Sequence, residues 1–272
     1  ILSNRTKGMK LFTCVIFLCC VLPLALQAQF PPSCDEDKSC IGRALEQTVT
    51  TGRGLQFVDV EKTPSQSTLT TAMTIEMWVQ PVKQNGRQYI AGFWGPHSSP
   101  NDDKNDVWVL YITPNDQLVF EINGGVLNLG ATDNTVVRTA LPGTFYTSWN
   151  HIAAVFDGAS QKVILYINGR ATDSASNAVY PATRLHIPEN KGLGMQIAGA
   201  NAVSDDDNFR TFKGQLDEVR LWSRSLTPKE ILCGKDRSFN GNEAGMVLYY
   251  RCNEKDNVYY LCDATGNGNT GV

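Results

Sequence analysis

The sequence contains no run of basic residues and little histidine. Its 24 Lys and Arg residues are outnumbered by 27 Asp and Glu, and only three histidines occur. Nucleic-acid binding requires a basic face, and attraction to anionic membranes requires a basic patch. We therefore expect no nucleic-acid partner.

Motifs of common catalytic and metal sites are also absent. The chain has no GxSxG nucleophile elbow, no phosphate loop, no dinucleotide-binding fingerprint and no CxxC pair. With three histidines and no CxxC pair, a zinc site is not expected. His151 lies inside a strand-like segment, which favours a core or edge position over a catalytic role.

The one long hydrophobic run, Leu11–Leu26, follows Met9-Lys10 and precedes the small residue Ala28. This order is typical of a secretory signal peptide. The alternative is a membrane anchor, but about 16 apolar residues are fewer than the roughly 20 that a span needs. We predict that residues 1–28 are an N-terminal extension and a cleaved signal peptide. The mature chain is then secreted or at the cell surface, with no stable membrane span.

Removal of this leader changes the charge and the number of cysteines. The leader carries three basic and no acidic residues, so the net charge moves from −3 to −6. Five of the eight cysteines remain, and in an oxidising compartment they favour disulfides. We expect Cys252 to pair with Cys262, and Cys34 or Cys40 to pair with Cys233, although spacing does not fix connectivity. The fifth thiol is left over or pairs outside the chain.

Residues 29–44 are predicted to be a short tether, and residues 45–272 a single domain. Segments of alternating apolar and polar residues, separated by Gly, Asn, Asp and Pro, indicate strands joined by turns. The clearest is Met73–Val79, predicted to be a half-buried strand. Two hairpins are expected, Val107–Thr113 with Gln117–Ile122 and Ile152–Phe156 with Lys162–Ile167. Further strands are predicted at Leu55–Val60, Gln88–Trp94, Gly194–Ala200, Gln215–Trp222 and Met246–Arg251.

One short helix is predicted at Thr227–Leu232, with Thr227 as its cap and Pro228 at its first position. Asn168-Gly169 predicts a tight turn with positive φ. About ten strands with one helical turn predict an all-β sandwich or barrel.

Five motifs occur in order along this domain: Ile75–Val79, Trp149–Gly158, Leu165–Gly169, Phe212–Leu226 and Asp263–Thr270. Together they resemble the LamG-like jelly-roll family, a branch of the concanavalin A-like lectin/glucanase sandwiches that is also similar to laminin G domains and pentraxins. The resemblance implies a two-sheet antiparallel jelly roll, often with a structural calcium. Family members usually serve as non-catalytic binding or adhesion modules within longer secreted proteins.

Strict alternation in Leu216–Trp222 would place Leu216, Glu218, Arg220 and Trp222 on one face. We expect Glu218 to pair with Arg220, while Asp217 would lie on the opposite, apolar face. A carboxylate there needs a partner, a cation or backbone donors.

Glucanases of this superfamily use a Glu-x-Asp-x-x-Glu strand whose carboxylates flank the sugar bond. The nearest segment, Gln215–Arg220, has Gln and Arg at the two glutamate positions. We therefore predict that the chain is not an enzyme.

The calcium implied by the resemblance would need about six to eight oxygen ligands. An acidic loop precedes the motif that carries Asp217, so the candidate ligands are Asp205, Asp207, Asn208 and Asp217. Asp59 is a fifth candidate, because it lies where family members have a Gly-Asn/Asp-Asp turn. The alternative is a solvated polar loop.

The expected function is that of a secreted module that recognises a glycan or an extracellular protein, as part of a longer polypeptide. One alternative is a carbohydrate-active accessory domain of a larger hydrolase. Another is a purely structural spacer. The sequence does not identify the ligand.

Overall fold

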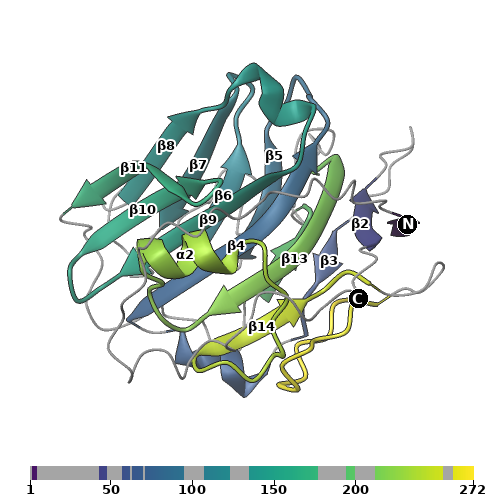
Figure 1. Cartoon of the computed structure of the whole chain (residues 1–272), viewed down its shortest axis with the longest axis vertical. Coiled ribbons are helices and arrows are strands. Elements are labelled where there is room, and N and C mark those ends of the chain that lie inside the picture. Colours follow the sequence, from purple (N-terminus) through teal and green to yellow (C-terminus); the bar gives the residue numbers. More distant parts are fainter. Residues whose placement is uncertain are drawn as a thin grey trace, which may run out of the picture.

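The computed structural model describes residues 2–4, 43–47, 57–61, 63–69, 71–94, 107–122, 135–176, 194–199, 212–253 and 260–272. These residues form two antiparallel sheets packed face to face (Figure 1). The predicted all-β jelly-roll sandwich is therefore confirmed.

The larger sheet has the strand order β1-β2-β13-β4-β9-β10-β11, with β14 also paired to β13. Its strands are β1 (Leu2–Asn4), β2 (Arg43–Gln47), β4 (Ala72–Pro81), β9 (Asn150–Asp157), β10 (Lys162–Ile167), β11 (Arg170–Ser176), β13 (Gly214–Trp222) and β14 (Met246–Tyr250). β1 and the first two residues of β2 come from the parts of the sequence assigned to the leader and the tether.

The smaller sheet has the order β3-β12-β5-β6-β7-β8. Its strands are β3 (Val58–Asp59), β5 (Gln88–Trp94), β6 (Trp108–Ile112), β7 (Gln117–Ile122), β8 (Thr135–Ala140) and β12 (Gly194–Ile197). The helical elements are η1 (Pro64–Thr68), η3 (Gly143–Tyr146) and α2 (Pro228–Gly234). Within these described ranges, no helix is long and apolar enough to span a membrane.

The main hydrophobic core lies between the two sheets. Both predicted hairpins form, as β6–β7 and β9–β10. The four alternating apolar residues of β4 are fully buried, as expected: Met73, Ile75, Met77 and Val79. The prediction that β4 is only half-buried is wrong, because Thr74 and Glu76 on its other face are also buried.

The outer face of β4 is buried because α2 and the residues after it cover the larger sheet (Figure 1). A second hydrophobic cluster lies beneath this cover, and it includes Val155, Tyr166, Trp222, Ile231 and Phe239. α2 begins as the sequence predicts: Thr227 and Glu230 form a capping box, with Pro228 in the first turn.

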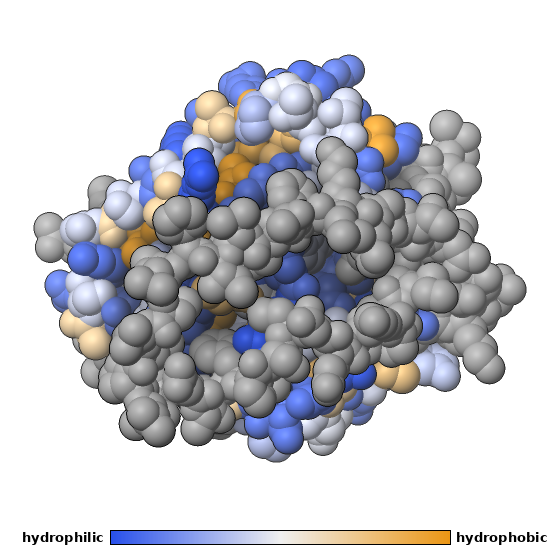
Figure 2. Space-filling view, viewed as in Figure 1, coloured by the Kyte–Doolittle hydropathy of each residue, from blue (hydrophilic) through white to orange (hydrophobic). Residues whose placement is uncertain are grey.

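On the face shown in Figure 2, the described residues at the surface are mostly polar. In the space-filling view, blue and white residues predominate and orange is confined to small areas (Figure 2). The exposed large hydrophobic residues lie in separate parts of the sequence: Val82, Leu232, Tyr260 and Val272. This pattern is that of an ordinary solvent-exposed surface.

The turn between β10 and β11 tests how closely α2 packs against the larger sheet. Asn168 and Gly169 have φ values of 53° and 79°, which confirms the predicted tight turn. A Cβ at Gly169 would lie 2.7 Å from Leu232 Cδ1. We predict that Gly169→Ala lowers the free energy of unfolding by about 1–3 kcal/mol, measured by urea denaturation.

Gly143→Ala is the matched control, because no atom lies within 4 Å of a Cβ built there. It should be neutral or stabilise the fold by less than about 1 kcal/mol. Equal destabilisation by the two substitutions would contradict this account of the turn.

Candidate functional site

The predicted calcium ligands fall partly outside the described residues. Asp205, Asp207 and Asn208 lie in the undescribed stretch 200–211. Asp59 lies on β3, where its Oδ1 accepts a hydrogen bond from Gln196 Nε2 at 2.7 Å. No group of three or more His, Cys, Asp or Glu side chains able to hold a metal occurs among the residues described. The calcium site therefore stays a prediction.

Asp217 lies on β13 and is 1% exposed. The prediction that it lies on the apolar face of the strand is wrong. A bulge interrupts β13 between Asp217 and Arg220, and Glu218 has φ of 54°. As a result Leu216 lies in the main core together with Val219 and Leu221. Asp217 pairs with Trp78 of β4, whose indole faces the α2 side. Because paired residues share a face, Asp217 lies on the covered polar face.

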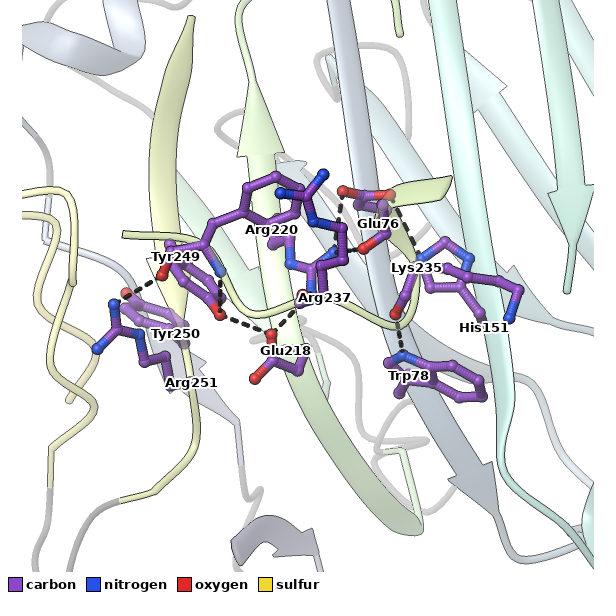
Figure 3. Close-up of polar contacts among 12 residues, drawn as sticks. Glu76, Trp78, His151, Glu218, Arg220, Lys235, Arg237, Tyr249, Tyr250 and Arg251 are labelled. Carbon is purple, nitrogen blue, oxygen red and sulfur yellow. Dashed lines mark hydrogen bonds and ion pairs between the residues drawn. The ribbon is translucent and has the colours of Figure 1, made fainter. Parts of the chain in front are cut away.

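The predicted pair of Glu218 and Arg220 is confirmed, and it belongs to a larger buried ion cluster (Figure 3). Arg220 Nη2 lies 2.7 Å from Glu218 Oε2, and Nη1 lies 3.4 Å from Glu76 Oε1. Tyr249 Oη donates to the same Glu218 oxygen at 2.6 Å. His151 Nε2 lies 3.3 Å from Glu76 Oε2. We call these five residues the ion cluster.

His151 is buried, in agreement with the core or edge position that the sequence favours. Its contact with Glu76 gives it a structural role in the ion cluster. The ion cluster also shifts three pKa values. Burial raises the pKa of Glu76, but the hydrogen bond with His151 and the charge of Arg220 outweigh it, so the pKa is lowered overall. Burial lowers the pKa of Arg220, but Glu76 and Glu218 raise it above its usual value. Burial and Glu218 both raise the pKa of Tyr249. These shifts keep Glu76 ionised and keep Arg220 and Tyr249 protonated, which are the states that form the contacts of the ion cluster.

The cluster also fastens the residues that follow α2 to the larger sheet. Arg220 donates to the backbone carbonyls of Gly234 and Arg237. Trp78 Nε1 donates to the carbonyl of Lys235 at 2.6 Å (Figure 3). The Arg220 guanidinium also lies 4.6 Å from the centre of the Phe239 ring. The outer face of β4 and β13 is therefore covered by the end of α2 and the residues after it.

The outer face of the smaller sheet is arranged differently. Its core side is apolar, with Leu110, Leu118, Phe120 and Val137 in the main core. The alternate residues lie on the outer side of the sheet, form rows across the strands and are for the most part buried as well. One row runs Tyr89, Tyr111, Val119, Arg138, and the next runs Asp59, Gln196, Gly92, Val109, Glu121, Val136. We call this surface the tyrosine face.

Two buried tyrosines hold two charged groups on the tyrosine face. Tyr89 Oη accepts a hydrogen bond from Arg87 Nη1 at 3.0 Å, and the Arg87 guanidinium lies 4.8 Å from the centre of the Tyr111 ring. Tyr111 Oη donates to Glu121 Oε2 at 3.3 Å. Arg87 is exposed and Glu121 half-buried, whereas the tyrosines are 5% and 8% exposed. The two tyrosines thus fix the positions of both charged side chains.

The protonation state of Tyr111 supports this arrangement. Burial, with the neighbouring charge of Glu121, raises the pKa of Tyr111 to about 12. The phenol therefore keeps its proton at neutral pH and remains a donor to Glu121. No local sequence signal connects Tyr111 with Arg87 or Glu121, because these residues meet only through the pairing of β5, β6 and β7.

The predicted disulfides remain untested. Cys252 is buried, and Cys233 and Cys262 are exposed. Cys34 and Cys40 lie outside the described residues. The structure shows no disulfide bond among the residues it describes. Both pairings stay predictions.

Comparison with known proteins identifies the family. Residues 56–232 match the concanavalin A-like lectin/glucanases superfamily. Because the match covers more than half of the chain, the protein belongs to this superfamily, and the resemblance seen in the sequence is confirmed. No curated protein matches the chain.

Solved structures show the same fold at low sequence identity. A Bacteroides ovatus protein classed as carbohydrate-binding has a TM-score of 0.57 and 20% identity, over 79% of this chain and 54% of that protein. The present chain thus spans about half the length of that protein. The carbohydrate-binding module of a Ruminococcus gnavus sialidase, solved with α2,3-sialyllactose, has a TM-score of 0.53 and 14% identity. That match covers 71% of this chain and 96% of the module.

The ion cluster predicts a pH-dependent contribution to stability. Glu76→Gln should lower the free energy of unfolding at pH 7 by about 3–5 kcal/mol, because Arg220 loses a buried partner. The pKa of Glu76 is lowered in the folded state, so its stabilisation is present above the unfolded pKa and is lost as pH falls through the folded pKa. The difference between wild type and variant should shrink in acid, measured by urea denaturation at pH 7 and pH 3.

Glu61→Gln provides the control, because Glu61 is an exposed carboxylate. It should change stability by less than about 0.5 kcal/mol at either pH. A Glu76→Gln variant as stable as wild type at pH 7 would show that the ion cluster does not support the fold.

Proposed function

We propose that the chain is a secreted, non-catalytic glycan-binding module, and that its ligand binds the tyrosine face at Arg87 and Glu121. Membership of a lectin-containing superfamily supports glycan binding. So does the shared fold with a carbohydrate-binding protein and a sialyllactose-binding module. The expected leader supports secretion. The observation that carries the location is the pair of charged groups that Tyr89 and Tyr111 hold in place.

The two outer faces of the sandwich favour this location. On the larger sheet, the carboxylates of Glu76 and Glu218 are engaged with Arg220 beneath the residues that follow α2. On the smaller sheet, Arg87 is exposed and Glu121 is half-buried, so both charged side chains can be reached from solvent. Sugar hydroxyls both donate and accept hydrogen bonds, so they need both kinds of partner.

The arrangement of carboxylates supports a binding role over catalysis. A glycosidase uses one carboxyl group as an acid and a second as a base or nucleophile. Glu218, in the segment nearest to the glucanase motif, accepts hydrogen bonds from Arg220 and Tyr249 within the ion cluster. A module of this kind serves either in adhesion or beside a hydrolase domain, and the same binding activity underlies both roles.

Glycan binding should depend on Glu121. We predict that Glu121→Gln raises the dissociation constant of any glycan found by array screening about 10- to 100-fold, because a hydrogen bond to a charged group contributes about 1.5–3 kcal/mol. Tyr111→Phe should weaken binding in the same direction, since Glu121 loses the phenol that positions it. Isothermal calorimetry measures both effects.

Asp236→Asn is the control for these variants, because this exposed carboxylate lies beside Lys235, after α2. It should leave the dissociation constant unchanged. Full binding by Glu121→Gln would place the ligand elsewhere. A chain that binds no glycan on a broad array would overturn the proposed function itself.

We also propose, from the family resemblance, that a calcium ion stabilises the domain and that Asp217, a buried carboxylate of β13, is one of its oxygen ligands. An ion at about 100 times its dissociation constant adds about 2.7 kcal/mol, which raises the melting temperature by roughly 5–10 °C. Thermal unfolding in millimolar calcium and in chelator should show this shift for wild type and not for Asp217→Ala. No shift in the wild type, or a full shift in the variant, would contradict the proposal.

A further inference from the structure

We infer that Asn85 is a site of spontaneous deamidation, and that the fold protects the other three Asn-Gly pairs that the structure describes. The sequence contains five such pairs, which begin at Asn85, Asn123, Asn168, Asn240 and Asn267. Asn123 lies outside the described residues. The inference is independent of the proposed glycan site, because it depends only on the hydrogen bonds of the asparagines and of the glycines that follow them.

An Asn-Gly pair deamidates without an enzyme. The backbone nitrogen of the glycine loses its proton, attacks Cγ of the asparagine side chain and forms a new C–N bond, while the side-chain amide gains a proton and leaves as ammonia. Water then opens the cyclic succinimide at either carbonyl and gives aspartate or isoaspartate. One water is consumed and one ammonia is released. Glycine favours the attack because it has no Cβ and its backbone turns readily.

The Asn85-Gly86 pair meets the requirements of this reaction. It lies in the loop that joins β4 to β5, and the Asn85 side chain is exposed. Gly86 is buried, but neither its N–H nor the Asn85 side chain takes part in a hydrogen bond among the residues that the structure describes. The side-chain amide can therefore rotate until Cγ faces the Gly86 nitrogen.

The loop around this pair is held at its base. Gln88 is buried, and its Nε2 donates to the Val82 carbonyl at 3.2 Å. Its Oε1 accepts a hydrogen bond from Gln84 Nε2 at 2.9 Å. These contacts lie on either side of Asn85 and do not involve its side chain. The reaction at Asn85 therefore requires no strand of either sheet to open, and we expect it in the folded protein.

Two of the other pairs are protected through the asparagine side chain. Asn168 Oδ1 accepts a hydrogen bond from the His151 N–H at 2.9 Å, and its Nδ2 donates to Asn150 Oδ1 at 3.1 Å. Asn267 Nδ2 donates to the Val247 carbonyl at 2.9 Å. Each amide must lose these hydrogen bonds before Cγ reaches the glycine nitrogen, which slows the reaction.

The fourth pair is protected through its glycine. The Gly241 N–H donates to Glu243 Oε2 at 2.8 Å. A Cβ at Gly241 would overlap the Ala264 carbonyl oxygen, so this glycine lies in a closely packed turn. The nitrogen that would attack Asn240 Cγ is therefore held by a carboxylate, and it must leave this contact before it reacts.

Peptide mapping of the aged protein tests the inference. The full chain is incubated at physiological pH and temperature and digested, and the aspartate and isoaspartate formed at each pair are measured by mass spectrometry. In the folded protein we expect Asn85 to deamidate about fivefold or more faster than Asn168, Asn240 and Asn267, because loss of one or two hydrogen bonds slows a reaction by about this factor or more.

The unfolded chain is the matched control. In concentrated urea the four pairs lose their native hydrogen bonds, so their rates should converge. A variant tests the protection directly: Glu243→Ala should release the Gly241 N–H and raise the rate at Asn240 about fivefold or more. The rates at Asn168 and Asn267 should stay low in this variant, which would show that the fold is kept.

Two results would overturn the inference. One is a rate at Asn85 in the folded protein no higher than the rate at Asn168. The other is the same order and ratio of rates in the folded and the unfolded chain, since the fold would then protect none of the pairs. Neither result bears on glycan binding, which is measured separately.

Discussion

The buried ion pair between Arg220 and its two glutamates is the interaction on which the arrangement of the larger sheet depends. A guanidinium with 1% exposure would be very unfavourable without partners, and here Glu76 and Glu218 supply them from β4 and β13. Glu218 and Arg220 are two residues apart and share a face, and the bulge between Asp217 and Arg220 places Asp217 on that face as well. The same guanidinium donates hydrogen bonds to the carbonyls of Gly234 and Arg237. Arg220 therefore joins the sheet to the last residue of α2 and to the residues that follow it.

This cluster gives the two outer faces of the sandwich different roles. On the larger sheet, the charged groups of the ion cluster contact one another, and the second hydrophobic cluster packs beneath α2 and the residues after it. On the smaller sheet, the tyrosines hold Arg87 and Glu121 where one is exposed and the other half-buried. Rigid support beneath polar groups is the arrangement that a selective binding site needs.

Much of the fold follows from the sequence, because its signals are local. The alternation in Met73–Val79, the positive-φ turn at Asn168-Gly169 and the cap at Thr227 each act over a few residues, and each is found in the structure. β11 was not predicted, because its residues are small or polar and mostly exposed. Its place as an edge strand comes from pairing with β10.

The candidate site is harder to predict, because its members come from separate strands. Glu218 and Arg220 are two residues apart, and their pairing could be inferred. The contact between Arg220 and Glu76, which lies 144 positions earlier, depends on the register between β4 and β13. A bulge cannot be read from alternation, so Asp217 was assigned to the wrong face. Arg87, Tyr111 and Glu121 likewise meet only through the pairing of β5, β6 and β7.

The most direct test of this account is a map of the ligand contact on the folded chain. Backbone amide resonances would be followed during titration with the tightest-binding glycan. The account predicts that the largest shifts occur in β5, β6 and β7, at Tyr89, Tyr111 and Glu121. Shifts concentrated instead on β13, α2 and the residues up to Phe239 would show that the covered face binds the ligand, and would contradict the division of roles between the two sheets.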